Sequence, residues 1–90
     1  MSSVERTAVI VNQKGLHARA AAKFAQLAGE FDADISVSRG GQTVSARSIM
    51  GLMMLAASTG TEVALSASGP DAEPALDAIC QLISDRFQED

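Results

Sequence analysis

Two short segments of alternating apolar and polar residues, joined by Gly40 and Gly41, limit what this chain can fold into more than any other feature. Residues 35–38 alternate, and residues 42–46 return with a more polar composition. A Gly-Gly pair between two such segments favours a tight β-hairpin, because both turn residues can take positive φ. Hairpin strands are antiparallel, and strict alternation predicts a sheet with one covered face and one solvated face.

The other strands and the first helix follow from the same kind of pattern. Residues 7–11 are β-branched and apolar, residues 61–67 alternate, and both segments are predicted strands. Residues 12–15 are a predicted turn. A helix is predicted after that turn, because Ala21, Phe24, Ala25 and Ala28 have the spacing of one helix face. Gly29 is the expected stop.

Two further helices are predicted in the second half of the chain. Ser48 is a favourable N-cap for a short helix over residues 48–56, whose Leu52, Leu55 and Ala56 are expected to face the sheet. Asp71 is the expected cap of the last helix, with Pro74 in its first turn. That helix carries an apolar stripe at spacings of three and four: Leu76, Ile79, Cys80, Ile83 and Phe87.

The predicted element order is therefore β-α-β-β-α-β-α, without an internal linker or repeat. Right-handed crossovers and one polar sheet face place all three helices on the same side of a four-stranded antiparallel sheet. We expect an α+β, open-faced sandwich that forms a single domain over residues 1–90. Nearly half of the residues are apolar, but only three are aromatic, so the core must be small and tightly packed.

Composition also excludes several classes of function. A net charge of −4 argues against a nucleic-acid binder. One cysteine and one histidine build neither an internal disulfide nor a zinc site, and we expect no metal or organic cofactor. Residues 1–6 lack the apolar core of a signal peptide, and no apolar run is long enough to span a bilayer. We expect a soluble, cytoplasmic monomer with a solvated acidic end (Asp85, Glu89 and Asp90).

His17 is the candidate reactive residue, because it lies where the first strand turns into the first helix. A neutral imidazole nitrogen is a nucleophile, and a helix N-terminus binds phosphate with unpaired N–H groups. The end of a helix also disfavours a protonated ring. A surface histidine with no function would occupy the same place. Two neighbours favour the functional interpretation: Arg19 can pair with phosphate oxygens, and Gly15 permits a close backbone approach.

Ser48 and the methionines form a second candidate site. A phosphate on Ser48 would meet a helix N-terminus and Arg47, although the residue can equally be a helix cap alone. Leu52 and Leu55 already occupy the inward stripe, so Met50 and Met53 are expected on the surface, where methionine adapts to several partners. Cys80 is expected to be a core residue with no redox task.

The two motifs together resemble a known family. Gly15-Leu16-His17-Ala18-Arg19, followed by Ser48-Ile49-Met50-Gly51-Leu52-Met53, is similar to HPr, the histidine-containing phosphocarrier family of the bacterial phosphoenolpyruvate-dependent phosphotransferase system. The resemblance covers essentially the whole chain and implies the HPr-type open-faced sandwich. It also implies a carrier protein, which forms a phosphohistidine but has no turnover of its own.

The resemblance implies roles for particular residues. His17 would accept a phosphoryl group on Nδ1 from phosphorylated enzyme I and pass it to a histidine of an enzyme IIA domain, while Arg19 stabilises the phosphate. Ser48 matches the regulatory serine of the HPr kinase/phosphorylase, in bacteria that have that enzyme. Leu16, Arg47, Ile49, Met50 and Met53 are the expected partner-binding residues. Lys14, Lys23, Arg19 and Arg47 make this surface basic, which predicts acidic rims on the partners.

Ala20 departs from the family pattern, because many sugar-transport members have proline after the arginine. Alanine there resembles members of the nitrogen-related phosphotransferase branch and of Alphaproteobacteria. The alternative function is therefore a regulatory interaction protein of that branch, acting mainly through its phosphorylation state. A small-ligand-binding domain would need a closed apolar pocket with convergent polar groups, and the sequence offers no such cluster.

Overall fold

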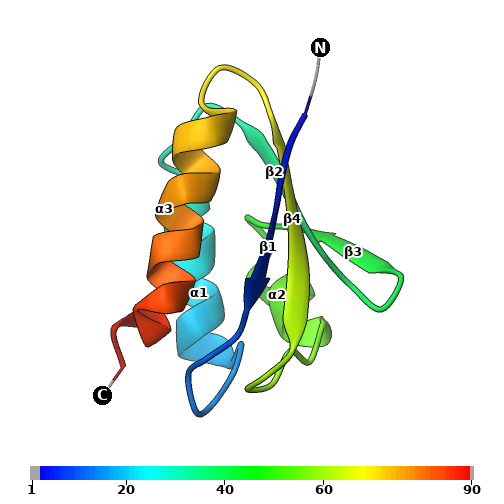
Figure 1. Ribbon diagram of the computed structural model, residues 1–90, viewed down its shortest axis with the longest axis vertical. Coiled ribbons are helices and arrows are strands. Elements are labelled where there is room, and N and C mark those ends of the chain that lie inside the picture. Colours follow the sequence, from blue (N-terminus) through cyan, green and yellow to red (C-terminus); the bar gives the residue numbers. More distant parts are fainter. Residues whose placement is uncertain (1–2, 90) are drawn as a thin grey trace.

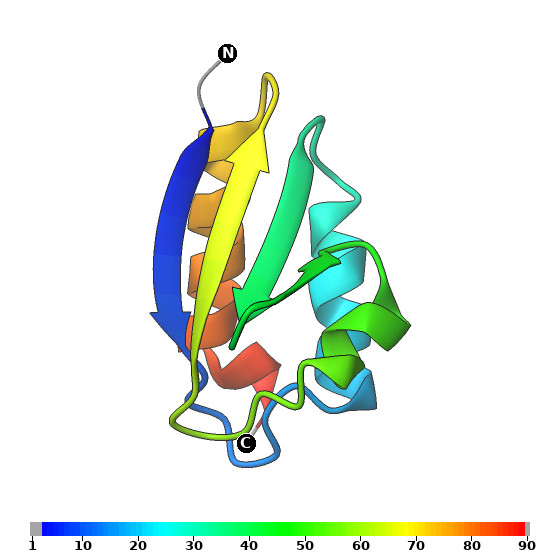
Figure 2. The ribbon, with the colours of Figure 1, turned by 90° about the vertical axis from the view of Figure 1, so that its right-hand side faces the viewer.

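A four-stranded antiparallel sheet forms one layer of the computed structural model, which describes residues 3–89. The strands are β1 (Val4–Val9), β2 (Asp34–Arg39), β3 (Gln42–Ser45) and β4 (Glu62–Ser68). Their order in the sheet is β1-β4-β2-β3, so the last strand in sequence lies between the first two (Figure 2). Gly40 and Gly41 join β2 to β3 with φ of 57° and 82°, as the predicted hairpin requires.

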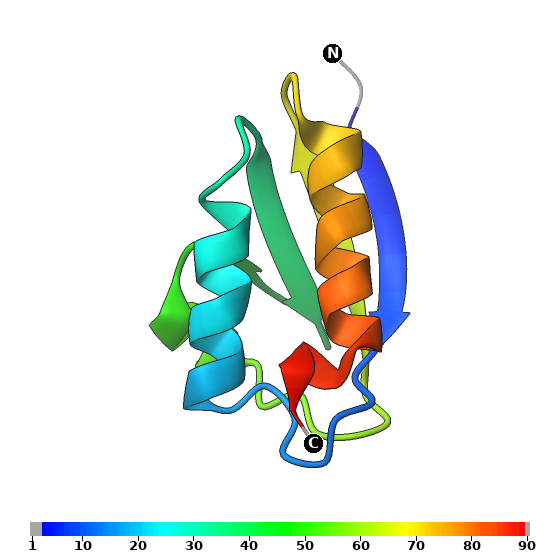
Figure 3. The same cartoon turned by 90° about the vertical axis from the view of Figure 1, so that its left-hand side faces the viewer.

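The helices lie on one side of this sheet. They are α1 (Ala18–Ala28), α2 (Ile49–Met54) and α3 (Ala72–Ser84), followed by the short 3₁₀ turn η1 (Arg86–Gln88). Figure 3 shows α1 and α3 side by side across one sheet face, and the edge-on view of Figure 1 shows the two layers. The smaller α2 packs against α1 and the edge strand β3. The α+β fold, its element order and the open sheet face were all predicted correctly.

The core lies between the sheet and the two long helices. Alternate residues of the strands point into it, including Val37 of β2 and Val63 and Leu65 of β4, all at most 1 % exposed. Phe24 of α1 and Leu76 of α3 cover them and are fully buried. This alternation confirms the predicted half-buried strands, and it leaves the other sheet face to polar side chains.

Some element boundaries differ from the sequence prediction. β1 was expected over residues 7–11 but spans Val4–Val9, because antiparallel pairing with β4 extends the ladder from Val9↔Glu62 to Val4↔Ala67. The second helix ends at Met54 rather than at residue 56. Ala56 adopts φ 52° and is exposed, so the expectation that it faces the sheet is wrong.

The two ends of the last helix also differ from expectation. Asp71 precedes α3, but its carboxylate makes no cap and instead accepts a hydrogen bond of 2.8 Å from the backbone N–H of Asp32. At the other end the helix stops at Ser84. Phe87 is buried as predicted, yet it belongs to η1, where Arg86, Phe87 and Gln88 have φ of 57°, 55° and 64°. We call Arg86–Glu89 the C-terminal hook. Asp90, expected to be solvated, falls outside the described residues.

Candidate functional site

The loop before α1 brings the backbone of residues 12–17 against the loop before β4. Gly15 adopts φ +66°, and a Cβ there would lie 2.9 Å from the Cα of Ser58. The next residue, Leu16, donates its N–H to the carbonyl of Ala57 at 2.9 Å. The hydroxyl of Thr59 donates to the carbonyls of Asn12 and Gln13, the latter at 3.0 Å. Only glycine fits this approach, which confirms the interpretation of Gly15.

His17 is the N-cap of α1 and has extended backbone angles (φ −77°, ψ −180°). Its carbonyl accepts the first helical hydrogen bond, from Ala21 N–H at 2.8 Å. The amides of residues 18–20 precede that bond, so they are the unpaired donors of the helix N-terminus. The predicted juxtaposition of imidazole and helix end is therefore present, and the ring is partly exposed, at 26 % of its side chain.

A carboxylate from the far end of the chain reaches this histidine. Glu89 Oε2 contacts His17 Nε2, and Glu89 Oε1 accepts a hydrogen bond of 3.1 Å from Asn12 Nδ2. The same Asn12 nitrogen also donates to the carbonyl of Gly15 at 2.8 Å. Asn12 is only 1 % exposed, so one buried amide links the loop, the histidine site and the hook.

Glu89 was expected to be a solvated acid, and that expectation is wrong. Its side chain is 18 % exposed. The hydrogen bond from His17, followed by that from Asn12, holds the pKa of the Glu89 carboxyl below its ordinary value of 4.5. Glu89 therefore carries a negative charge at neutral pH. No local sequence pattern identifies it, because its partners lie more than seventy residues earlier in the chain.

Two contacts anchor the hook that carries Glu89. Phe87 is fully buried beneath α1, and its backbone carbonyl accepts a hydrogen bond of 2.8 Å from Lys23 Nζ. Three successive residues in the left-handed region cost about 1 kcal/mol or more each. Burial of a phenylalanine side chain offsets part of that cost, at about 1.5–3 kcal/mol. The hook is thus held by packing rather than by local preference.

Positive side chains surround the histidine. A shallow pocket at this end of α1 is lined by Lys14, Arg19 and Lys23 together with His17 and Glu89. Arg19 is exposed, and within residues 3–89 its guanidinium makes no ion pair with an acidic side chain. Three cations around one carboxylate leave the pocket net positive, which suits an arriving dianionic phosphate.

The predicted partner-binding residues divide into two groups. Ile49, Met50 and Met53 of α2 are 42 %, 70 % and 40 % exposed, so they form an accessible apolar patch on the helix that packs against α1. Met54 is also exposed, at 65 %. Leu16, in contrast, is 5 % exposed and belongs to the core. Leu16 therefore offers little surface to a partner, and its expected partner-binding role stays a prediction.

Ser48 caps α2 as predicted: its Oγ accepts the N–H of Gly51 at 2.9 Å. Arg47 does not extend along this helix end. Its Nη2 donates to the carbonyls of Phe31 at 2.9 Å and Ala33 at 3.3 Å. The guanidinium therefore holds the α1–β2 loop, and pairing with a phosphate on Ser48 would require it to release those carbonyls.

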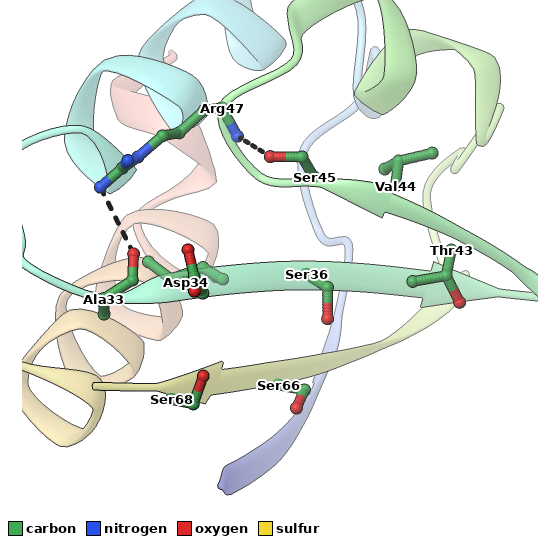
Figure 4. A pocket seen from close by; sticks show the side chains of 10 residues that line it. Ala33, Asp34, Ser36, Thr43, Val44, Ser45, Arg47, Ser66 and Ser68 are labelled. Carbon is green, nitrogen blue, oxygen red and sulfur yellow. Dashed lines mark hydrogen bonds between the residues drawn. The ribbon is translucent and has the colours of Figure 1, made fainter.

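In the part of the chain that the structure describes, the open sheet face has no cluster of reactive and charged side chains like the one around His17. The open sheet face has a concavity lined mainly by hydroxyl groups, among them Ser36, Thr43, Ser66 and Ser68, with Arg47 at its rim (Figure 4). It is neither closed nor apolar, unlike a small-molecule pocket.

Cys80 is half-buried, and burial raises the pKa of its thiol, which keeps it protonated. Helices with the length and hydropathy to cross a membrane are absent from residues 3–89.

Comparison with known proteins gives a consistent picture. The family described as "PTS HPr component phosphorylation site" matches residues 4–85. A phosphocarrier protein HPr of Cupriavidus necator is 51 % identical over 96 % of this chain and 97 % of its own length. A phosphocarrier protein NPr of Shewanella violacea is 48 % identical over 99 % and 98 %. The crystal structure of HPr-C-His from Thermoanaerobacter tengcongensis has a TM-score of 0.90 and 46 % identity, covering 100 % of this chain and 99 % of that one.

Proposed function

Because this chain belongs to the HPr family of phosphotransferase-system phosphocarriers, we propose that His17 is its phosphoryl acceptor and that Nδ1 is the reacting nitrogen. The observation that carries this proposal is the position of the ring at the N-cap of α1, inside a pocket with three cations. His17 is also the only histidine in the sequence, so a phosphohistidine has one possible site.

Transfer to His17 needs charge stabilisation more than it needs acid or base chemistry. The arriving phosphoryl group carries its negative charge on equatorial oxygens, which donors at the helix end and nearby cations can stabilise. Arg19 lies two residues after the ring, is exposed, and is the cation best shaped for bidentate pairing. Lys14 adds a point charge at the loop. The partial exposure of the ring suits a carrier, which must release the group to an acceptor as readily as it takes it.

Enzyme I is the proposed donor and an enzyme IIA domain the proposed acceptor. The apolar patch of Ile49, Met50 and Met53 supports this, because a small apolar surface beside the reacting group permits brief docking. The basic residues around His17 favour partners with acidic rims. The expected monomeric state stays a prediction, which light scattering after size-exclusion chromatography would test.

Regulation through Ser48 is the second part of the proposal, in bacteria that have the HPr kinase/phosphorylase. The Ser48 side chain is half-buried as the cap of α2 and lies next to the exposed Ile49. A dianionic group there would put negative charge beside the docking patch and repel an acidic partner. Arg47 offers limited compensation, because its guanidinium is engaged with the carbonyls of Phe31 and Ala33.

The carrier role is tested by phosphorus NMR after incubation with enzyme I, magnesium and phosphoenolpyruvate. We expect an acid-labile phosphoramidate signal that is absent from His17→Ala and retained by Ser48→Ala. A signal that persists in His17→Ala would contradict the proposal. A phosphomonoester that appears only with ATP and the serine kinase, with no phosphoramidate, would make Ser48 the functional centre instead.

The alternative, a regulatory protein of the nitrogen-related branch, rests on the resemblance of Ala20 to members of that branch, since many sugar-transport members have proline there. Ala20 is fully buried in the first turn of α1 and keeps a backbone N–H, which proline would lack. The similarity to an NPr agrees with this branch without choosing it over the sugar branch. Offering the phosphorylated chain to enzyme IIA domains of the two branches decides between them, since the cognate acceptor should be phosphorylated faster.

A further inference from the structure

The hydrogen bond between the hook and His17 has a defined direction. Glu89 accepts through both oxygens, Oε2 from His17 and Oε1 from Asn12. An ionised carboxylate has no proton to donate, so the proton in the His17 contact must belong to Nε2. A neutral imidazole carries one ring proton, and placing it on Nε2 leaves a free lone pair on Nδ1.

We propose that Glu89 is a positioning residue for phosphoryl transfer: its carboxylate holds the Nε2–H tautomer of His17 and keeps Nδ1 available as the nucleophile. This inference rests on the proposed function. The arrangement resembles the general case in which a carboxylate on one ring nitrogen fixes the reactivity of the other. Because Glu89 meets Nε2 and the phosphoryl group is proposed to bind Nδ1, the two do not compete for the same nitrogen.

The position of Glu89 is fixed by residues with little freedom. Asn12 is buried, and its amide nitrogen faces two acceptors, the Gly15 carbonyl and Glu89 Oε1. A rotated amide would turn its oxygen toward both of them, so its orientation is determined. On the other side, Phe87 is buried and its carbonyl is held by Lys23. The backbone that leads to Glu89 is therefore held by α1, through Lys23, and by the core, through Phe87. This holds the Glu89 carboxylate beside the His17 ring.

The transfer step balances without a proton leaving the ring. The Nδ1 lone pair forms the N–P bond, the bond from phosphorus to the donor's leaving nitrogen breaks, and that nitrogen keeps the electron pair. The imidazole retains its Nε2 proton and gains positive charge, which the adjacent Glu89 carboxylate offsets. On release, the N–P bond breaks, the acceptor takes the phosphoryl group, and the ring returns to the neutral Nε2–H form.

The test uses potassium phosphoramidate as the donor, so that partner docking plays no part. In that reaction ammonia leaves from phosphorus as the N–P bond to His17 forms. We expect Glu89→Ala to accept phosphate about fivefold more slowly, which is the scale of one partly exposed hydrogen bond to a charged group. Glu89→Gln keeps an acceptor oxygen without its charge, so its rate should lie between Glu89→Ala and the unmodified protein. Asp85→Asn is the matched control, because the Asp85 carboxylate, four residues before Glu89, accepts a hydrogen bond from Gln81 Nε2 on α3 instead.

A second readout separates positioning from a structural role. Long-range proton–nitrogen NMR of the His17 ring reports which nitrogen carries the proton, and we expect the Nε2–H population to fall in Glu89→Ala and to remain in Asp85→Asn. Equal or faster phosphorylation of Glu89→Ala, or an unchanged tautomer, would overturn the proposal; a faster rate would mean that Glu89 blocks the ring. An unmodified protein that takes no phosphate on His17 would contradict the proposed function instead, while the tautomer comparison would still test the contact.

Discussion

Phe87 stacks on Phe24, with ring centroids 6.5 Å apart and an angle of 30° between the rings. Both side chains are fully buried, one from the hook and one from the helix that His17 caps. The pair therefore joins the segment that delivers Glu89 to the element that carries the proposed acceptor. Interactions of this kind contribute about 0.5–1.5 kcal/mol beyond the area that they bury.

Truncating Phe87 should therefore affect both stability and the site. We expect Phe87→Ala to lower the free energy of unfolding by about 3–4 kcal/mol, through lost burial and the cavity left behind. It should also release Glu89 from His17. Urea denaturation measures the first effect, and the His17 ring tautomer reports the second. Phe87→Leu is the control and should lose less; equal stability of Phe87→Ala and the unmodified protein would contradict the anchoring role.

Gly15 and Gly40 offer a matched pair of glycine substitutions. Both have positive φ, but a Cβ at Gly40 meets nothing within 4 Å, whereas one at Gly15 meets the backbone of residues 57 and 58. Gly40→Ala should cost about 1 kcal/mol for its backbone angles alone. Gly15→Ala should cost at least about 2 kcal/mol, because the clash adds to that strain. Thermal unfolding of both variants tests the difference, and similar losses would show that the two loops do not approach as described.

Acid should weaken the hook. The pKa of Glu89 is lowered in the folded protein from an ordinary value of 4.5, by His17 first and then Asn12. A lowered folded pKa contributes stability that is present above about pH 4.5 and is lost as pH falls through the folded value. The stability difference between the unmodified protein and Glu89→Gln should therefore shrink below pH 4.5. Denaturation curves from pH 7 to pH 3 measure it, and a difference that grows toward low pH would reverse the assignment.

Substitutions of two α2 residues should distinguish an effect on partner binding from an effect on stability. Met50 is 70 % exposed and Leu52 is fully buried, although they lie two positions apart. Met50→Ala should leave the free energy of unfolding within about 0.5 kcal/mol of the unmodified value but weaken binding to enzyme I. Leu52→Ala should lower stability by about 2–5 kcal/mol. Calorimetric titration with enzyme I and urea denaturation distinguish the two; unchanged affinity of Met50→Ala would remove this residue from the proposed interface.

The basic residues around His17 predict a salt-sensitive encounter. Lys14 is exposed in the loop before α1. We expect Lys14→Gln to slow association with enzyme I at low salt, and the difference should fade above about 0.5 M salt as screening shortens the range of the charge. Thr7→Glu, on the open face of β1, changes the net charge equally and serves as the control. An association rate that does not change with ionic strength would contradict the prediction that the partners have acidic interface rims.

Local pattern was enough to predict most of the fold. Alternation located β2 and β4, the glycine pair located the hairpin, and apolar spacing located α1 and most of α3. Local patterns could not predict the order of the strands in the sheet, because β1 pairs with β4, which lies more than fifty residues later in the sequence. The limits of β1 were misjudged for the same reason, since pairing carried the ladder through polar Glu5 and Arg6. Arg6 is further supported by Glu73 and Asp77, 3.7 Å and 3.6 Å away on α3.

The site was predicted in part. His17 and Ser48 are the N-caps of α1 and α2, as expected, and Arg19 is exposed. Leu16 is buried and Arg47 binds two backbone carbonyls. The functional roles of these residues stay predictions. The hook was missed because Phe87 continues the spacing of Leu76, Ile79 and Ile83, so periodicity alone extends the helix. Phe87 is buried as that spacing predicts, but its backbone adopts left-handed angles instead of continuing the right-handed helix. A pattern of apolar residues reports which side chains enter the core, and it does not report the path by which they arrive.

The dispersed origin of the site has a consequence for synthesis of the chain. Its parts come from residues 12–19, from Ala57 to Thr59, and from Glu89. A nascent chain can begin to collapse once β4 has emerged, yet the histidine lacks its carboxylate partner until residue 89 has left the ribosome. The contact between His17 and Glu89 therefore forms after the sheet. Incomplete chains on the ribosome contain the imidazole ring but not the carboxylate that binds it.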